Sequence, residues 1–191
     1  MSIRLHEIHP AIVHFPIALL PTALGADALG RASGNAALMG MGRRAMALTA
    51  ISAAVSGVAG LIAQEEVRAE GRARDLLITH RNLNIVFTTT TIALALRRAR
   101  RSRPSRGYLA LGLAAMGLVS YTGYIGSHMV YEHGVGVKEA GGIPEGAAPE
   151  ITADNVGDVA RRAAEDIQQG LARTVQEIAN GELVPALTRG G

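Results

Sequence analysis

Histidines are the residues of this chain best suited to chemistry, and three of the six come before or within its first apolar stretch. His9 and His14 belong to the sequence HPAIVHFPIALL, residues 9–20, and His6 comes just before it. Apolar segments long enough to cross a bilayer rarely carry ionisable groups without a functional reason. The chain has no cysteine, which excludes disulfides, thiolate zinc sites, Cys-ligated iron–sulfur clusters and covalent c-type haem. Imidazole is then the obvious ligand, and it suits haem iron, copper, zinc or nickel.

Four apolar stretches predict four membrane-spanning helices, over residues 10–29, 45–63, 77–96 and 108–131. A helix of about 20 residues crosses the roughly 30 Å hydrocarbon core of a bilayer. Pro16 and Pro21 should kink the first helix. Ser52, Ser56 and Gly60 recur at four-residue steps, which is typical of tight helix contacts in lipid. Residues 1–137 are therefore predicted to form a four-helix transmembrane domain, with a loop over residues 30–44.

The last third of the chain differs in composition from the first two. Residues 138–153 are rich in Gly and Pro and are expected to form a linker. Residues 154–180 predict an amphipathic helix outside the membrane, within a periplasmic segment that runs to residue 191. Its apolar residues recur at steps of three or four along one stripe: Val156, Val159, Ala163, Ile167, Leu171, Val175 and Ile178. The predicted fold class is all-α, an integral membrane four-helix bundle with a C-terminal extramembrane helix.

The distribution of arginines predicts the orientation in the membrane. Residues 30–44 and 97–107 contain arginines with no acidic residue between them, whereas residues 64–81 mix both signs. By the positive-inside rule, the arginine-only side is cytoplasmic. The chain is thus expected to be a multi-pass protein of the bacterial inner membrane with both termini in the periplasm. The net charge of +3 does not indicate nucleic-acid binding, because the arginines form no face interleaved with aromatic residues.

This topology brings the histidines of three helices to the outer side of the bilayer. We expect them to bind one or two b-type haems, with His14 and His80 as the axial pair. His133, His128 and His9 are alternates or a second pair, and the same set without His128 could hold a metal ion. Small residues let a porphyrin approach the backbone, and an arginine can neutralise a propionate; the candidates are Gly123, Gly126 and Arg81. Each also has a structural interpretation, such as a helix start at His9-Pro10 or helix packing at the glycines.

The predicted function is electron transfer between a periplasmic redox partner and quinone or a partner oxidoreductase. Two alternatives stay open: a non-haem copper or zinc binding or transport protein, and a structural membrane subunit that docks a larger complex through residues 154–180. No nucleophile–base pair or phosphate loop is visible, so an electron-transfer subunit is favoured over a stand-alone enzyme. Near the histidines the only methionine is Met129, which weighs against Cu(I) because thioethers select that ion.

Two motifs resemble one family of bacterial membrane proteins, known as domain of unknown function 2231. They are His9-Pro10-x-x-Val13-His14-Phe15-Pro16-Ile17-Ala18-Leu19, and Tyr121-x-Gly123-x-x-Gly126-x-x-x-Val130-Tyr131-x-His133-Gly134-Val135-Gly136-Val137. The resemblance covers about residues 5–137 and implies a cytochrome-b-like four-helix membrane domain. It also implies that the family-type histidines are His9, His14, His80 and His133. His128 departs from the pattern, which favours a small residue there, and residues 154–180 lie outside it.

Overall fold

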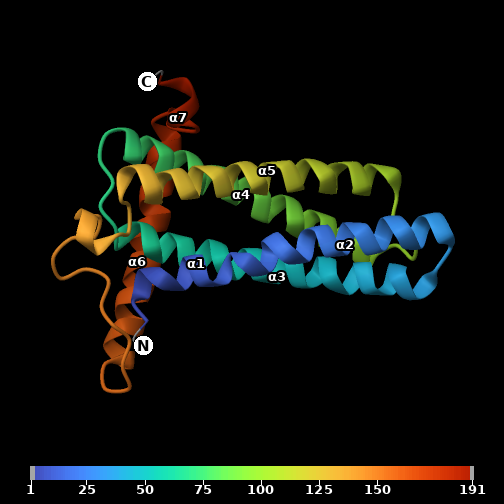
Figure 1. The fold of residues 1–191 in the computed structure, drawn as a ribbon, viewed down its shortest axis with the longest axis horizontal. Coiled ribbons are helices and arrows are strands. Elements are labelled where there is room, and N and C mark those ends of the chain that lie inside the picture. Colours follow the sequence, from blue (N-terminus) through green and yellow to red (C-terminus); the bar gives the residue numbers. More distant parts are fainter. Residues whose placement is uncertain (1–2, 190–191) are drawn as a thin grey trace. The chain divides into compact units, whose positions relative to one another are not determined.

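The computed structural model describes residues 3–189, and its regular elements in that range are helices (Figure 1). In chain order they are η1 Leu5–Glu7, α1 Ile8–Ile12, α2 His14–Ser33, α3 Ala36–Glu65, α4 Arg72–Ala99, α5 Arg106–His133, η2 Lys138–Ala140, α6 Val156–Ala179 and α7 Pro185–Thr188. The prediction of an all-α chain is confirmed at this level.

Three helical stretches within the described residues are long and apolar enough to cross a membrane: Leu5–Ser33, Ala36–Glu65 and Arg106–His133. They contain three of the four predicted spans. The remaining predicted span, 77–96, lies inside α4, which does not reach the same hydropathy. The physical reason is its polar sequence, because Arg81, Asn82 and Asn84 and the threonines from Thr88 to Thr91 interrupt its apolar residues.

The connection between α2 and α3 is much shorter than the loop expected over residues 30–44. Only Gly34 and Asn35 separate the two helices. Gly34 has a φ of 71°, the left-handed conformation that commonly ends a helix. The side-chain oxygen of Asn35 accepts hydrogen bonds from the amides of Ala37 and Leu38, at 2.9 and 3.1 Å. Asn35 thereby satisfies donors at the start of α3, as a helix N-cap does.

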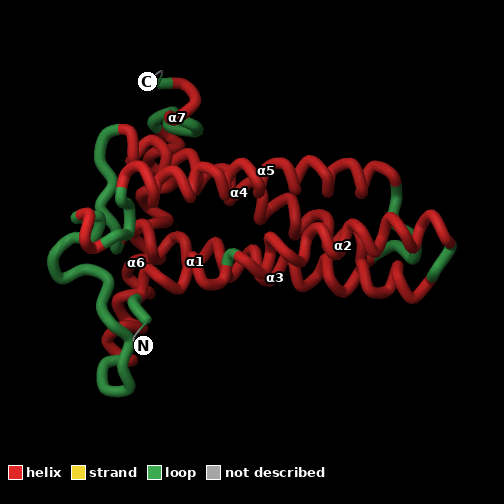
Figure 2. The backbone as a smooth tube through the Cα atoms, in the orientation of Figure 1, coloured by secondary structure: helices red, strands yellow, loops and turns green. Residues whose placement is uncertain are grey.

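The first span is interrupted at Val13, between α1 and α2 (Figure 2). Pro16 follows three residues later. A proline has no amide hydrogen, and its ring crowds the carbonyl of the residue four positions earlier, here Ile12. The interruption therefore falls where Pro16 disturbs the helix. Pro21, by contrast, lies inside α2.

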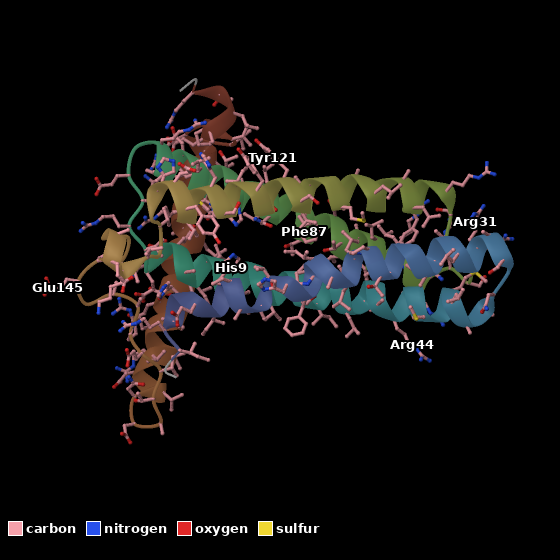
Figure 3. All side chains as sticks on the ribbon, in the orientation of Figure 1. His9, Arg31, Arg44, Phe87, Tyr121 and Glu145 are labelled. Carbon is pink, nitrogen blue, oxygen red and sulfur yellow. The ribbon has the colours of Figure 1, made fainter. Side chains whose placement is uncertain are left out.

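The chain divides into two compact units. The first unit contains the residues up to Ala11, Gly57–Leu83 and those from Gly123 onward, and the second contains Ile12–Ser56 and Asn84–Thr122. In the second unit, parts of α2 to α5 enclose a core that includes Leu20, Leu94 and Phe87, the last of which is labelled in Figure 3. Arg44, labelled in the same figure, is exposed on α3.

A buried ion pair joins α2 and α4 inside the second unit. Arg98 Nε and Nη2 donate to the two carboxylate oxygens of Asp27, each at 2.8 Å. Arg98 Nη2 also donates to the Met39 carbonyl at 2.7 Å. Asp27 is fully buried and Arg98 is 2% exposed. One arginine of the expected cytoplasmic arginine cluster is therefore part of the protein interior.

The first unit is built from the ends of the long helices and the C-terminal segment. Its apolar core includes Leu76, Ile125 and Met129, together with Ala186 from α7. The predicted linker is tied to the N-terminal segment, because the amide of Leu5 donates to the Pro149 carbonyl at 3.1 Å. Residues 138–153 thus form an ordered connection between α5 and α6, and α6 packs on α3 and α4.

Candidate functional site

Two imidazoles from different helices lie together in the first unit. His9 on α1 and His80 on α4 have ring centroids 6.2 Å apart, with ring planes at 89° to each other. Both side chains are half-buried, and His9 is labelled in Figure 3. This pair, which we call the His9–His80 pair, is the candidate site.

Each imidazole of the pair lies against a glycine of a third or fourth helix. A Cβ atom on Gly60 of α3 would lie 3.2 Å from both Cε1 and Nδ1 of His9. A Cβ atom on Gly126 of α5 would lie 3.2 Å from Cε1 and 3.7 Å from Nδ1 of His80. In both rings the Nδ1–Cε1 edge faces the glycine, and Nε2 is not among the ring atoms closest to that point. Four helices therefore build this site, two with imidazoles and two with glycines.

The two glycines that we expected beside a porphyrin have different surroundings. Gly126 contacts His80, whereas a Cβ atom on Gly123 would meet nothing within 4 Å. Gly60, which the sequence suggested only as a packing residue, contacts His9. The signal that could have identified it is its small-residue spacing on α3, although that spacing alone does not say which side chain it receives.

His14 lies in the second unit, where its side chain is exposed. The expected axial pair, His14 and His80, takes one residue from each unit and stays a prediction. Arg81, the residue expected to meet a propionate, is buried and engaged elsewhere. Its Nη1 donates to Glu177 of α6 at 2.7 Å, and its Nε donates to the side-chain oxygen of Asn82 at 3.0 Å. Within the first unit, Arg81 fastens α6 to α4.

The remaining candidate ligands form a second group at the end of α5. The ring centroids of His128 and His133 are 5.6 Å apart at an interplanar angle of 89°. The ring of Tyr124 stacks on His128 with centroids 5.9 Å apart. His133 and Tyr124 are exposed. Among residues 3–189, no group of three or more His, Asp or Glu side chains is positioned to hold a metal ion.

His6 was not among the residues predicted to bind haem or a metal ion. It is buried, at 8% exposure, although it lies near the N-terminus. Its Nδ1 is buried without a hydrogen-bond partner. A Cβ atom on Gly136 would lie 3.7 Å from its Cδ2 atom, so His6 packs near the turn that follows α5.

Comparison with known proteins identifies a family. The model of a family described as predicted membrane protein (DUF2231) matches residues 5–139. This range takes in α1 to α5 and ends before α6. No curated protein and no solved structure matches the chain. The family resemblance based on the two histidine-containing motifs is confirmed.

Proposed function

Since the chain belongs to the DUF2231 family of predicted membrane proteins, we propose that it is a membrane subunit that binds b-type haem and transfers electrons. His9 and His80 would hold the haem through their imidazole nitrogens. The observation that supports this proposal is the pair itself, two imidazoles from separate helices, 6.2 Å apart between ring centroids. In a membrane protein, ionisable groups of this kind mark functional sites.

The spacing of the two rings would allow both imidazoles to hold one metal ion. Imidazole nitrogen lies about 2.0–2.1 Å from a bound metal, so two imidazoles that share one ion have ring centroids at most roughly 6 Å apart. Perpendicular ring planes are compatible with this arrangement, because each ring can turn about its own nitrogen–metal axis. The glycines meet the Nδ1–Cε1 edges, which leaves Nε2 as the nitrogen directed away from the glycine contact in both rings.

The set of available ligands favours haem over a bare ion. Zinc sites commonly use three or four protein ligands, and the described residues offer no group of three. A haem would need at most two ligands from the protein, and His9 and His80 would provide them. When bound, haem provides a one-electron redox centre. The chain's own contribution is to hold both imidazoles on helices and to place a glycine, which has no side chain, beside each of them, at Gly60 and Gly126.

The proposal includes the arrangement of the chain in a bacterial inner membrane. We propose that α4 is the fourth span, that the helix ends carrying the histidines face the periplasm, and that the arginine-rich ends face the cytoplasm. The observation in its favour is the charge asymmetry of the sequence, since Arg43 and Arg44 are exposed on α3 with no acid nearby in the sequence. A haem near the periplasmic face suits exchange with a periplasmic redox protein, and quinone or a partner oxidoreductase would be the second partner.

A second candidate function rests on the other histidine pair. His128 and His133 have ring centroids 5.6 Å apart, which also permits a shared ion, and His133 is exposed at the end of α5. Two protein ligands, one of them the exposed His133, would bind copper or zinc weakly and let the ion exchange with solvent. It is compatible with a haem at the His9–His80 pair and would be a separate site.

Visible spectroscopy tests the haem proposal. The full-length protein is purified in detergent from cells supplied with haem precursor, and its dithionite-reduced minus oxidised spectrum and pyridine haemochrome content are recorded. We expect b-type bands that disappear in His9→Ala and in His80→Ala. The matched controls are His14→Ala and His128→Ala, which should keep their haem.

Three results would contradict the proposal. A featureless spectrum of the unmodified protein would exclude a haem function. Loss of haem in His14→Ala with retention in His9→Ala would move the axial ligand to His14. Retention in both His9→Ala and His80→Ala would exclude the His9–His80 pair as the ligand set. Bound copper or zinc that is lost only in His128→Ala would support the second site.

A further inference from the structure

Helix α6 turns its polar side chains toward the rest of the first unit and leaves most of its apolar stripe exposed. The buried residues of α6 include one large apolar side chain, Val159, beside Asp166, Gly170, Thr174 and Glu177. Leu171 is 50% exposed and Val175 is 68% exposed. This is the reverse of a helix that packs on a soluble core, where the apolar face is covered. The exposed apolar face, which we call the α6 stripe, consists of Val156, Leu171, Val175 and Ile178, with Ile167 half-buried between them.

The contacts of α6 determine which way the α6 stripe faces. Arg162 and Arg173 form ion pairs with Glu66 and Glu65, at the C-terminal end of α3. Gly170 packs on Gln64 and Leu61 of α3, because a Cβ atom there would lie 2.6 Å from Gln64 Nε2 and 3.0 Å from the Leu61 carbonyl oxygen. Leu61 is one helical turn further back along α3 than Glu65. The side of α6 that carries the two arginines therefore lies at the C-terminal end of α3. The side that carries Gly170 lies further back along α3, toward Gly57.

The α6 stripe lies beyond Gly170 on the circumference of α6. At 100° per residue, the rotation about the helix axis that leads from the two arginines to Gly170 leads next to Leu171, Val175 and Ile178. They face back along α3, away from its C-terminal end at Glu65. The opposite side of α6 is polar and faces beyond the end of α3, and it carries Asp158, Glu165, Gln169 and Gln176.

Figure 1 shows α6 crossing the ends of α3 and α4 at a steep angle. The crossing is fixed by contacts to both helices, since Glu177 accepts hydrogen bonds from Arg74 and Arg81 of α4, at 2.9 and 2.7 Å. A helix across the end of a membrane-spanning helix lies along the membrane surface. Tyr124 and Tyr131, exposed on the last turns of α5, are residues typical of that interface.

We infer that α6 is an interfacial helix whose α6 stripe is buried in the lipid bilayer, at the boundary between headgroups and acyl chains. Such helices insert their apolar face about 5–10 Å and keep their charged face in water. Lipid is the occupant that fits, because the α6 stripe is exposed and faces back along α3, a helix long and apolar enough to cross a membrane. The inference does not depend on the histidines, and it gives α6 a membrane contact in addition to any docking role.

Single-tryptophan variants of the full-length protein test this inference, because the chain contains no tryptophan. Val175→Trp places the probe on the α6 stripe, and Gln176→Trp places it on the polar side one residue away. Leu171→Trp and Gln169→Trp form a second matched pair. Each variant is reconstituted into phosphatidylcholine–phosphatidylglycerol vesicles with and without lipids brominated near the headgroup. Circular dichroism and gel filtration identify variants that fold, and the second pair replaces the first if either member of the first does not.

We expect bromolipid to quench the α6-stripe tryptophan several-fold more strongly than the polar-side tryptophan, and aqueous acrylamide to show the opposite order. Equal access of acrylamide to both probes, with no bromolipid quenching, would overturn the inference by showing a stripe in water. An α6-stripe tryptophan shielded from both quenchers would also overturn it, since a second copy or another protein segment would then cover the stripe.

Discussion

Removing the charge of Asp27 should strongly destabilise the protein. Asp27 and Arg98 are at most 2% exposed, and their bidentate contact at 2.8 Å is the main compensation for a buried guanidinium. Breaking a buried ion pair by removing one partner typically costs about 3–5 kcal/mol, because the remaining charge stays buried. We therefore expect Asp27→Asn and Arg98→Met each to lower the free energy of unfolding by about this amount. Arg100→Met, on an exposed neighbour, should change it by less than about 0.5 kcal/mol.

A double-mutant cycle separates loss of the pair from loss of packing. The Asp27→Leu/Arg98→Met double variant removes both charges together, and replacing a buried pair by apolar residues is often neutral or stabilising by about 1–4 kcal/mol. Its effect should thus be far smaller than the sum of the two single changes, Asp27→Leu and Arg98→Met. The assay is reversible unfolding in mixed detergent micelles, followed by circular dichroism. Additive effects, or single variants no worse than Arg100→Met, would refute the reasoning that the pair is buried and mutually dependent.

Three further predictions concern the glycines and α6. Gly126→Ala should lower haem content several-fold, because its Cβ atom would lie 3.2 Å from His80 Cε1. Gly123→Ala should leave haem content unchanged, because the space around Gly123 is open. Pyridine haemochrome measures the haem content of both variants. Gly34→Ala should cost about 1–2 kcal/mol in thermal unfolding, because a φ of 71° is strained for alanine. Burial and the neighbouring Glu66 carboxylate raise the pKa of Asp166 to about 6. Between about pH 4 and 6 the folded state therefore binds more protons than the unfolded state, so the free energy of unfolding should rise when the native chain is brought from pH 8 to 5. The rise should be smaller in Asp166→Asn.

Local signals in the sequence account for much of the helical architecture. Apolar stretches predicted the three helices that are long and apolar enough to cross a membrane. The periodicity over 154–180 predicted α6, observed as Val156–Ala179. The short connection at Gly34-Asn35 carried a readable signal as well, a left-handed glycine followed by an N-cap residue. It was obscured by Gly40 and Gly42, which suggested a loop. In the structure a Cβ atom on Gly42 would lie 2.5 Å from Asp27 Cγ, so this glycine makes room for the buried carboxylate.

Contacts between distant residues could not be predicted from the same signals. Arg98 and Asp27 are 71 positions apart, and nothing in the arginine-rich stretch distinguishes Arg98 from its neighbours. The stripe on α6 was visible in the sequence, but the direction it faces was not. That direction depends on which residues of α6 meet α3, and only the contacts of Gly170, Arg162 and Arg173 determine it.

The first histidine motif illustrates how local geometry limits a prediction that spacing alone leaves open. His9 and His14 are five residues apart, so on a regular helix their side chains would point about 140° apart. One continuous helix could not present both to the same partner. The interruption at Val13 separates them further, since His9 belongs to α1 and His14 to the first turn of α2. In the structure His80 of α4 lies beside His9. We therefore expect the two histidines of the motif to have separate roles, and the haem content of His9→Ala and His14→Ala tests this expectation.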